Sequence, residues 1–249
     1  GLDLYLLHNE FVDEEIAAVY LAGLDRLNNE EPLAYVLGFQ WFYDSKIMVN
    51  ENVLIPRPET EELVNNVLMD IDDYFTNDIE IVDVATGSGA IAISLAKDLG
   101  LSVDASDISE EALLVASKNA ELNGVKVNFY QGDMLDPILD LNKKYDVLLC
   151  NPPYIKEIED VQTSVLDFEP HIALFGGNDG LYFYRKVFEK AHLVLKERSL
   201  MAFEIGFDIG EALLELGKSY FPEAKIELKQ DINGLDRMLF IYRGINHRD

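Results

Sequence analysis

The chain has 249 residues, of which 49% are hydrophobic and 27% are charged, with 16 glycines and 8 prolines. This is an ordinary globular composition, and it excludes disordered, collagen-like and low-complexity proteins. Lys and Arg number 20 against 46 Asp and Glu, which gives a formal net charge of −26. Because affinity for nucleic acid comes mainly from Lys and Arg, this charge disfavours a direct nucleic-acid partner. The most basic stretch is a scattered one, made of Arg185, Lys186, Lys190, Lys196 and Arg198.

Cys150 is the only cysteine, which excludes an internal disulfide framework and a cysteine-rich zinc site. No run approaches the ~20 apolar residues that span a bilayer, and no signal peptide opens the chain. We therefore predict a cytoplasmic protein without a membrane partner or a bound metal. Since the first residue is Gly rather than Met, we expect the N-terminal part to be truncated.

Residues 1–37 predict a small helical part. Apolar residues recur at spacings of three and four over residues 2–31, and Asp13 with the acids that follow it is typical of a helix start. Pro32 is expected to end this helical stretch. The part is too short to hold a hydrophobic core by itself.

Residues 38–58 predict a hairpin and a linker. Apolar residues alternate on both sides of Asp44-Ser45, as in two paired strands, and we expect Trp41 to lie in the core. Arg57 lies between two prolines in a stiff, extended segment. Thr60 is then expected to cap the next helix, whose first turn is acidic.

A larger domain is predicted over residues 59–249. From residue 79, short apolar strands alternate with amphipathic helices, which is typical of an α/β fold whose mostly parallel sheet is covered on both faces. The predicted strands are Ile79–Ala85, Ser102–Asp107, Val127–Tyr130, Tyr145–Cys150, Leu200–Ile205, 224–229 and 237–242; the predicted helices are Ala90–Leu99, 109–122 and 180–196.

The first candidate site is the loop Asp83-Val84-Ala85-Thr86-Gly87-Ser88-Gly89-Ala90, between a strand and a helix. Its glycines let the backbone turn sharply at the carboxyl end of a strand, where open α/β sheets bind ligands. Asp107 ends the next strand, 20 residues after Gly87, where an acid can accept hydrogen bonds from ribose hydroxyls. The pattern favours a nucleoside ligand. Because Gly87, Gly89 and Ala92 also satisfy the dinucleotide fingerprint, NAD is an alternative ligand. A second alternative is a tight turn that binds no ligand, with Asp107 as a solvated acid.

The second candidate site is Asn151-Pro152-Pro153-Tyr154, directly after a buried strand. Two prolines make this turn rigid, while the Asn151 side chain and backbone carbonyls offer acceptors and Tyr154 offers a flat ring. Such a turn suits a planar NH₂ group, and the alternative is a loop-forming Asn-Pro with a buried tyrosine. Beside a nucleoside loop, the turn favours methyl transfer from S-adenosylmethionine to an amide or amine nitrogen. Positioning of the reacting atoms can supply roughly 7–11 kcal/mol of such a barrier.

Together these two motifs resemble a class I methyltransferase of the amino-methylating kind. Longer stretches narrow the resemblance to the PrmC/HemK family, which methylates the glutamine amide in the Gly-Gly-Gln loop of bacterial peptide-chain release factors. These stretches are Glu31-Pro32-Leu33-Ala34-Tyr35-Val36-Leu37-Gly38, Val53-Leu54-Ile55-Pro56-Arg57-Pro58-Glu59-Thr60-Glu61, Phe168-Glu169-Pro170-His171-Ile172-Ala173-Leu174-Phe175-Gly176-Gly177-Asn178-Asp179-Gly180-Leu181 and Gly234-x-Asp236-Arg237. Arg57-Pro58-Glu59-Thr60 favours a release factor over a ribosomal protein as substrate.

The resemblance implies a Rossmann-like class I methyltransferase fold that binds S-adenosylmethionine and releases S-adenosylhomocysteine. The implied cofactor-binding residues are Asp83, Ala85, Thr86, Gly87, Ser88, Gly89, Asp107, Ile108, Asp133, Met134 and Asn151. The implied catalytic residues are Asn151, Pro152 and Tyr154, and the substrate-binding residues are these three with Pro153, Arg57 and Glu59. Two departures are that Ala85 stands where the family usually has Gly, and that the helical part before Glu31 is shorter.

Other readings and residues remain open at this point. An amino-methyltransferase acting on a flipped nucleic-acid base is the nearest alternative, followed by a nicotinamide oxidoreductase and an inactive binding module. Arg57 and Glu59 form either a structural ion pair or part of the wall of a substrate groove. Cys150 is expected to be a buried apolar side chain, and His171 a structural hydrogen-bonding residue.

Overall fold

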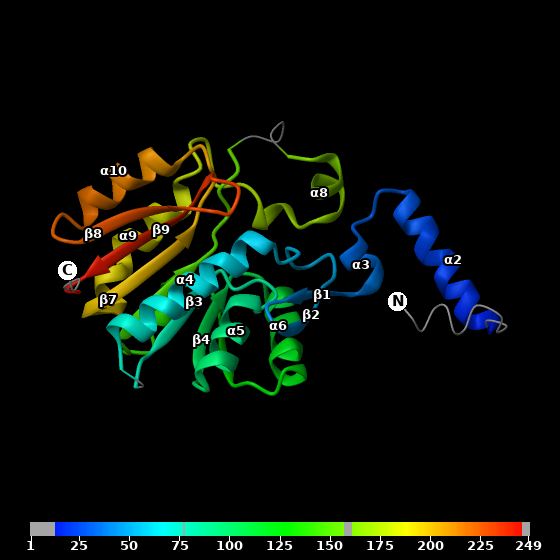
Figure 1. Cartoon of the computed structure of the whole chain (residues 1–249), viewed down its shortest axis with the longest axis horizontal. Coiled ribbons are helices and arrows are strands. Elements are labelled where there is room, and N and C mark those ends of the chain that lie inside the picture. Colours follow the sequence, from blue (N-terminus) through cyan, green and yellow to red (C-terminus); the bar gives the residue numbers. More distant parts are fainter. Residues whose placement is uncertain (1–12, 77, 157–160, 246–249) are drawn as a thin grey trace.

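The computed structural model describes residues 13–76, 78–156 and 161–245. Seven strands lie in one sheet: β3 (Ile81–Val84), β4 (Val103–Asp107), β5 (Val127–Gln131), β6 (Tyr145–Cys150), β7 (Leu195–Glu204), β8 (Lys225–Gln230) and β9 (Asp236–Arg243). Their order is β5-β4-β3-β6-β7-β9-β8, and β9 is antiparallel to both of its neighbours. The predicted α/β fold with a mostly parallel, seven-stranded sheet is confirmed (Figure 1).

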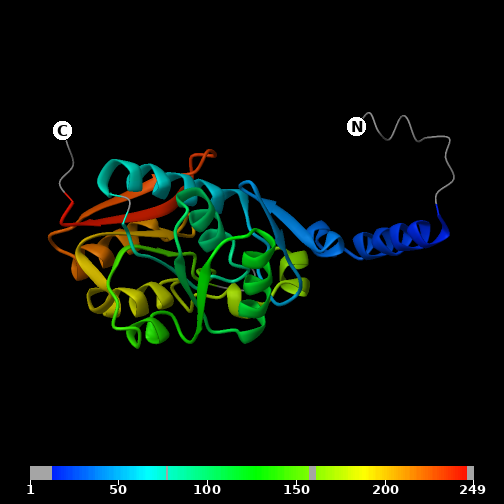
Figure 2. The same cartoon turned by 90° about the horizontal axis from the view of Figure 1, so that it is seen from below.

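Helices cover both faces of this sheet (Figures 1 and 2). One face carries α4 (Pro58–Tyr74), α5 (Ala90–Leu99) and α6 (Glu110–Leu122), and the other carries α7 (Asp136–Leu139), α9 (Tyr182–Val194) and α10 (Gly210–Tyr220). Successive residues of β6 alternate between the two cores: Val147 and Leu149 face α4–α6, while Leu148 and Cys150 face α9 and α10. Cys150 is therefore a fully buried apolar side chain, as predicted.

The helix starts follow the sequence signals only in part. Ser109 caps α6, since its hydroxyl accepts a hydrogen bond from Ala112 N at 3.1 Å. The prediction that Thr60 caps a helix is wrong, because α4 already begins at Pro58, and Pro suits the first turn where N–H groups have no partner. The sequence reading also did not find α7, α10, the short helix α8 (Thr163–Phe168) or the 3₁₀ turn His171–Ala173.

The N-terminal helical part stands away from the sheet. Helix α2 (Glu14–Asn28) projects from the body of the molecule, and α3 (Leu33–Leu37) links it to the hairpin (Figures 1 and 2). Asp13 caps α2 as predicted, accepting a hydrogen bond from Glu15 N at 2.8 Å. The helix ends before Pro32, as predicted. The part of the predicted helical stretch before residue 13 lies outside the described residues. The domain boundaries at 37 and 58 stay a prediction.

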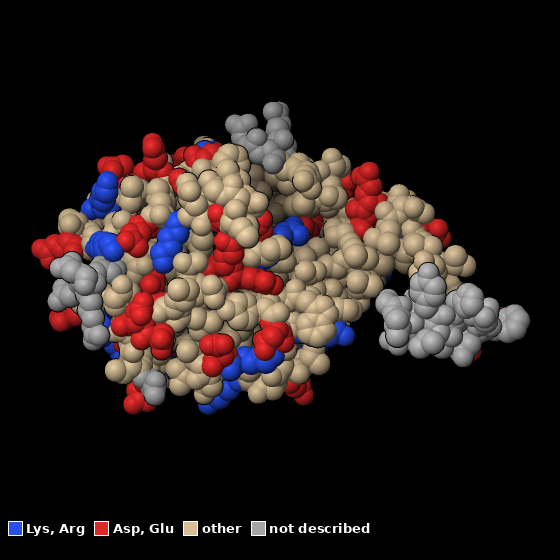
Figure 3. Space-filling model, viewed as in Figure 1, with Lys and Arg blue, Asp and Glu red and all other residues tan. Residues whose placement is uncertain are grey.

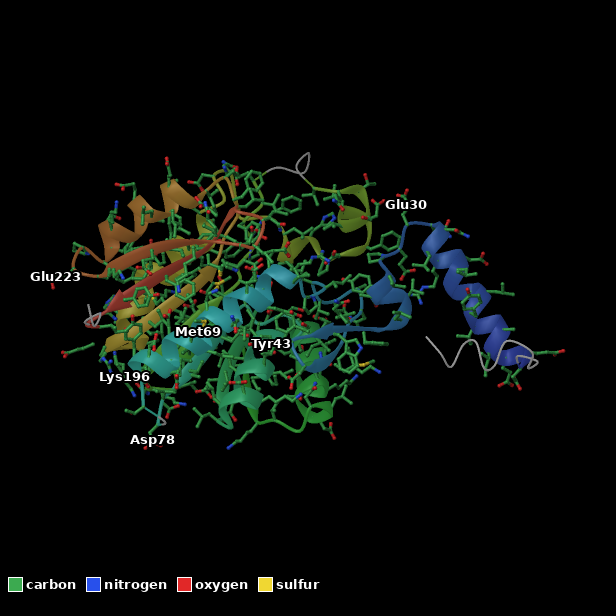
Figure 4. The ribbon with its side chains drawn as sticks, in the orientation of Figure 1. Glu30, Tyr43, Met69, Asp78, Lys196 and Glu223 are labelled. Atoms are coloured by element: carbon green, nitrogen blue, oxygen red, sulfur yellow. The ribbon has the colours of Figure 1, made fainter. Side chains whose placement is uncertain are left out.

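The predicted hairpin is present as β1 (Phe39–Phe42) and β2 (Ser45–Met48). Its turn is tied to α4, because Tyr43 N donates to Glu61 Oε1 at 2.8 Å. Tyr43 is labelled in Figure 4. The prediction that Trp41 belongs to the core is wrong: its side chain is 59% exposed, whereas Phe42 is fully buried. A strand sends neighbouring side chains to opposite faces, so burying Phe42 turns Trp41 outward.

Within the described ranges, no helix combines the length and the apolar character needed to cross a membrane.

Candidate functional site

Strand register brings the three predicted site segments to one place. Val84 of β3 pairs with Ser106 of β4 on one side and with Cys150 of β6 on the other. The next residue of each strand is therefore at the same carboxyl-terminal edge: the loop after Val84, then Asp107, and Asn151. This edge is also where the chain switches direction along the sheet, from β5 back to β6, as expected for a ligand crevice.

The loop between β3 and α5 has a backbone that suits glycine. Gly87 and Gly89 have φ angles of +54° and +83°, and Ala85 also lies in the left-handed region, at +60°. In that region a Cβ costs about 1 kcal/mol or more, so glycine would adopt the Ala85 conformation more easily than alanine does. The loop nevertheless closes with alanine in place.

Asp83 lies under this loop and holds it. Its Oδ2 accepts hydrogen bonds from Thr86 Oγ1 at 2.6 Å and from Ala92 N at 3.2 Å. Its Oδ1 is buried and has no hydrogen-bond partner in the described part of the chain. Burial raises the pKa of Asp83 to about 7, opposed by the two hydrogen bonds on Oδ2.

Asp107 connects the loop to the next helix. Its Oδ2 accepts a hydrogen bond from Gly87 N at 2.8 Å, and its Oδ1 accepts one from Ser109 N at 3.0 Å. Burial raises the pKa of this carboxyl, and the hydrogen bonds from Ser109 and Gly87 oppose that rise. Two acceptor oxygens each keep a free lone-pair position, so this carboxyl can still bind ligand hydroxyls.

A cavity of about 340 Å³ opens above these residues. Its lining includes most of the predicted cofactor-binding residues: Ala85, Thr86, Gly87, Ser88, Asp107, Ile108, Asp133, Met134 and Asn151. Asp83 and Gly89 lie outside the lining and shape the loop from behind. The wall combines the carboxylates of Asp107 and Asp133 with apolar side chains such as Ile91, Ile108 and Met134, and the volume lies in the usual range for small-molecule sites. These features fit a nucleoside with an attached amino-acid chain.

The cavity is also lined by residues of α9 that were not predicted to bind a cofactor. Lys186 of α9 forms an ion pair with Asp133 and lines the cavity, as does Phe183. Met134 has a φ angle of +53°, and its carbonyl accepts a hydrogen bond from Ser106 Oγ at 2.8 Å. The periodicity of the sequence predicted helix α9. It could not predict that this helix contacts the loop after β5, because that contact depends on the fold.

The corner Asn151-Pro152-Pro153-Tyr154 divides the first cavity from a second one. Asn151 and Pro153 line the first cavity, whereas Tyr154 lines a second cavity of about 450 Å³. Pro152 is buried and lines neither. The corner thus faces two spaces, one on each side of Asn151.

The second cavity bears on the two alternatives stated for Arg57 and Glu59, an ion pair with each other or a place in the wall of a groove. Both residues line it, but Arg57 forms its ion pair with the buried Glu169 rather than with Glu59. Glu169 also accepts a hydrogen bond from Ile55 N at 3.1 Å, so the pair fixes the stiff segment before α4. His171 has the structural role predicted for it, with Nε2 donating to Leu166 O at 2.8 Å.

Two further residues reach the corner from distant parts of the chain. Thr60 Oγ1 accepts a hydrogen bond from Asn151 Nδ2 at 3.3 Å and donates one to Glu204 Oε2 at 2.6 Å. Glu204 ends β7, where Phe203 pairs with Cys150, so it lies beside Asn151. One signal in the sequence could have pointed to Glu204: it is an acid directly after the apolar run Leu200–Phe203.

Comparison with known proteins identifies similar chains. Residues 61–168 match the family model described as "Methyltransferase small domain". The "Release factor glutamine methyltransferase" of Bacillus subtilis is 47% identical over 213 residues, covering 84% of this chain and 74% of that protein. The protein of the same description from Lactococcus lactis is 40% identical over 241 residues, covering 96% of this chain and 87% of its own length. In three dimensions, a methyltransferase from Pyrococcus furiosus aligns with a TM-score of 0.58 at 17% identity, over 89% of this chain and 98% of that one, which shows the shared fold.

Proposed function

The chain belongs to the family of release factor glutamine methyltransferases, and we propose that it methylates the side-chain nitrogen, N5, of the glutamine in the Gly-Gly-Gln motif of bacterial peptide-chain release factors. The observation that carries this proposal is the shared edge of β3, β4 and β6, where the loop, Asp107 and Asn151 line one cavity. The partner is then a release factor, and the cytoplasm is the corresponding location.

S-adenosylmethionine is the methyl donor in this proposal. The loop Ala85–Gly89 wraps its methionine part, Asp107 accepts hydrogen bonds from the ribose hydroxyls, and Ile108, Asp133 and Met134 surround the adenine. When bound, the donor supplies a methyl group on an already activated sulfonium. The chain's own task is therefore to bind, orient and exclude water rather than to activate a nucleophile.

The corner orients the glutamine amide. Asn151 Oδ1 and the Pro152 carbonyl accept the two amide N–H bonds, and the Tyr154 ring packs against the amide plane. These acceptors aim the nitrogen at the methyl carbon and stabilise the positive charge that develops on nitrogen. The amide proton that methyl transfer to this nitrogen would release can leave to water, so the corner needs no general base. Positioning of this kind can supply roughly 7–11 kcal/mol.

The second cavity gives the substrate loop its place. Tyr154, Arg57 and Glu59 line it, and Arg57 also lines the donor cavity, so the two cavities have a shared wall. A substrate loop bound there would have to present its glutamine at Asn151 on the side away from the sulfur, as an in-line displacement requires. Glu59 and Arg57 present a charged wall to the residues that flank the glutamine.

The decisive test is mass spectrometry of an unmodified release factor incubated with the enzyme and S-adenosylmethionine. We expect a gain of one methyl group on the Gly-Gly-Gln glutamine, located by fragmentation. A DNA duplex incubated in parallel is expected to gain none. Methylation of the duplex without methylation of the release factor would refute the proposal.

Two variants separate turnover from donor binding. Asn151→Ala removes an acceptor for the substrate amide, so we expect turnover to be lost while donor affinity in calorimetry stays within about threefold. Asp107→Ala removes charge-assisted hydrogen bonds and is expected to weaken donor binding by ~1–3 kcal/mol. Asn65→Ala, at an exposed asparagine of α4, is the matched control and should retain both. Full turnover in Asn151→Ala would remove that residue from the mechanism.

A further inference from the structure

A chain of hydrogen bonds runs from the catalytic corner into the protein. Asn151 Nδ2 donates to Thr60 Oγ1 at 3.3 Å, and Thr60 Oγ1 donates to Glu204 Oε2 at 2.6 Å. Tyr154 Oη donates to the other carboxylate oxygen, Glu204 Oε1, at 3.2 Å. The participants come from the first turn of α4, the end of β6 and the end of β7, so the fold rather than local sequence assembles them.

The direction of each hydrogen bond is fixed by chemistry. An ionised carboxylate has no proton, so Glu204 can only accept, and the single hydroxyl proton of Thr60 must point to it. The short distance of 2.6 Å agrees with a charge-assisted bond. Thr60 Oγ1 then offers only lone pairs to Asn151, which has to present its NH₂ group there. Asn151 Oδ1 is therefore directed to the opposite side of the amide, and it has no hydrogen-bond partner among the residues that the structure describes.

We infer that Thr60 and Glu204 are positioning residues that set the orientation of the Asn151 amide, so that its oxygen and not its NH₂ group meets the substrate amide. The inference rests on the proposed function, in which Asn151 Oδ1 accepts a substrate N–H. With the opposite orientation, two NH₂ groups would face each other as donors, and the substrate amide would lose its acceptor.

Tyr154 is held by the same carboxylate, so one buried acid organises both sides of the corner. The groups that face Glu204 are Thr60 and Glu59 from α4, Tyr154 from the corner and Arg237 from β9, and Tyr184 of α9 donates to its backbone oxygen at 2.7 Å. Burial raises the pKa of Glu204, opposed by Thr60, Arg237 and Tyr154, while the negative charge of Glu59 raises it further. Protonated Glu204 can donate to Thr60 Oγ1, which frees the Thr60 proton for Asn151 Oδ1 and stabilises the wrong amide orientation.

The test compares Thr60→Val with Thr60→Ser in the full chain. Valine keeps the shape and removes the hydroxyl, whereas serine keeps the hydroxyl. With release factor and S-adenosylmethionine, we expect Thr60→Val to lower kcat roughly 100-fold, because the acceptor is no longer oriented. The Kd for the donor is expected to stay within about threefold, and Thr60→Ser should recover most of kcat. A kcat for Thr60→Val close to that of the unaltered enzyme, or equal losses in both variants, would overturn the inference.

A second readout needs no turnover, so it separates this inference from the proposed function. The Asn151 side-chain NH₂ signal in a ¹⁵N–¹H spectrum is assigned by its loss in Asn151→Asp. We expect that signal to shift and to exchange faster with solvent in Thr60→Val, and to keep its position in Thr60→Ser. If the signal is the same in all Thr60 variants, the hydrogen-bond chain does not hold the amide, whatever the substrate is.

The pH profile tests Glu204. The unaltered enzyme should lose kcat on the acid side as Glu204 takes up a proton, with donor binding retained. Glu204→Gln cannot ionise, so it is expected to have a lower kcat without that acid limb. An acid limb of unchanged midpoint in Glu204→Gln would show that another group titrates, and would remove the carboxylate from the positioning role.

Discussion

Asp83 holds the loop, but its burial makes its charged form costly at neutral pH. Its Oδ2 holds the loop through Thr86 and Ala92, while its Oδ1 is buried without a partner in the described part of the chain. Burial raises its pKa from 3.8 to about 7. A charged carboxylate is therefore costly in the free protein, because a buried charge without full hydrogen bonding is destabilising. The folded state therefore favours the protonated form of the carboxyl that holds the loop.

This raised pKa predicts a pH-dependent stability. Between pH 3.8 and about 7 the folded state binds the proton more tightly than the unfolded state, so the contribution of Asp83 to stability falls as pH rises through that window. Asp83→Asn keeps one acceptor oxygen and cannot ionise. We expect the Tm of this variant, relative to the unaltered protein, to rise between about pH 5 and about pH 8. Differential scanning fluorimetry across that range checks it, and a Tm difference that does not vary with pH would contradict it.

Among the elements, the segment between Leu174 and Gly180 braces the catalytic corner. Ile155 N donates to Leu174 O, and Gly176 N donates to Ile155 O, both at 2.9 Å. A Cβ on Gly176 would lie 2.5 Å from Pro153 O and 2.7 Å from Tyr154 Cα, so no side chain fits there. The glycine is needed for close approach of two backbones rather than for its φ angle.

Gly176→Ala should therefore displace the corner. We expect a loss of turnover of roughly 100-fold, since small shifts of the acceptors cost that much. Donor affinity should remain within about threefold, because the atoms nearest the added Cβ belong to the backbone of the corner and of Gly180, and not to the loop Ala85–Gly89 or to Asp107. Gly217→Ala is the matched control: in α10 its Cβ meets mainly a flexible Ile226 methyl at 3.1 Å, and activity should persist. Equal activities in the two variants, with Tm recorded for both, would show that the brace does not set the corner.

The secondary-structure elements also show which features could be predicted from the sequence and which could not. The strand Tyr145–Cys150 was predicted at its observed bounds because a buried parallel strand is a continuous apolar run. By contrast, β7 begins at Leu195, five residues before its predicted start, where the sequence is mostly polar. The loop, Asp107 and Asn151 were found because each follows an apolar run. Thr60 was mistaken for a cap because its role depends on a contact across 144 residues, with Glu204. Such a contact follows from strand register and helix placement, which local periodicity does not encode.

At the scale of the whole molecule, acidic side chains outnumber basic ones. Figure 3 shows Asp and Glu distributed over the visible face, with fewer Lys and Arg among them. The basic stretch singled out in the sequence does not form a free cationic surface, since four of its five members are bound to acids: Arg185 to Asp179, Lys186 to Asp133, Lys190 to Asp136 and Lys196 to Asp146. The net charge of −26 means that acidic side chains without a basic partner repel one another.

Salt should therefore stabilise this protein. Contact ion pairs lie within the Debye length of ~8 Å and are weakly screened, whereas repulsion between separated carboxylates is long-ranged and is screened first. Exposed ion pairs also contribute only ~0–1 kcal/mol each, so weakening them costs little. We expect the Tm to rise between low salt and roughly 0.3 M NaCl, by roughly 2–4 °C for each kcal/mol of relieved repulsion. KCl at equal ionic strength should give the same rise, because screening does not depend on the cation. A Tm that falls with salt would mean that the ion pairs, and not the excess of acids, dominate the electrostatic free energy of the fold.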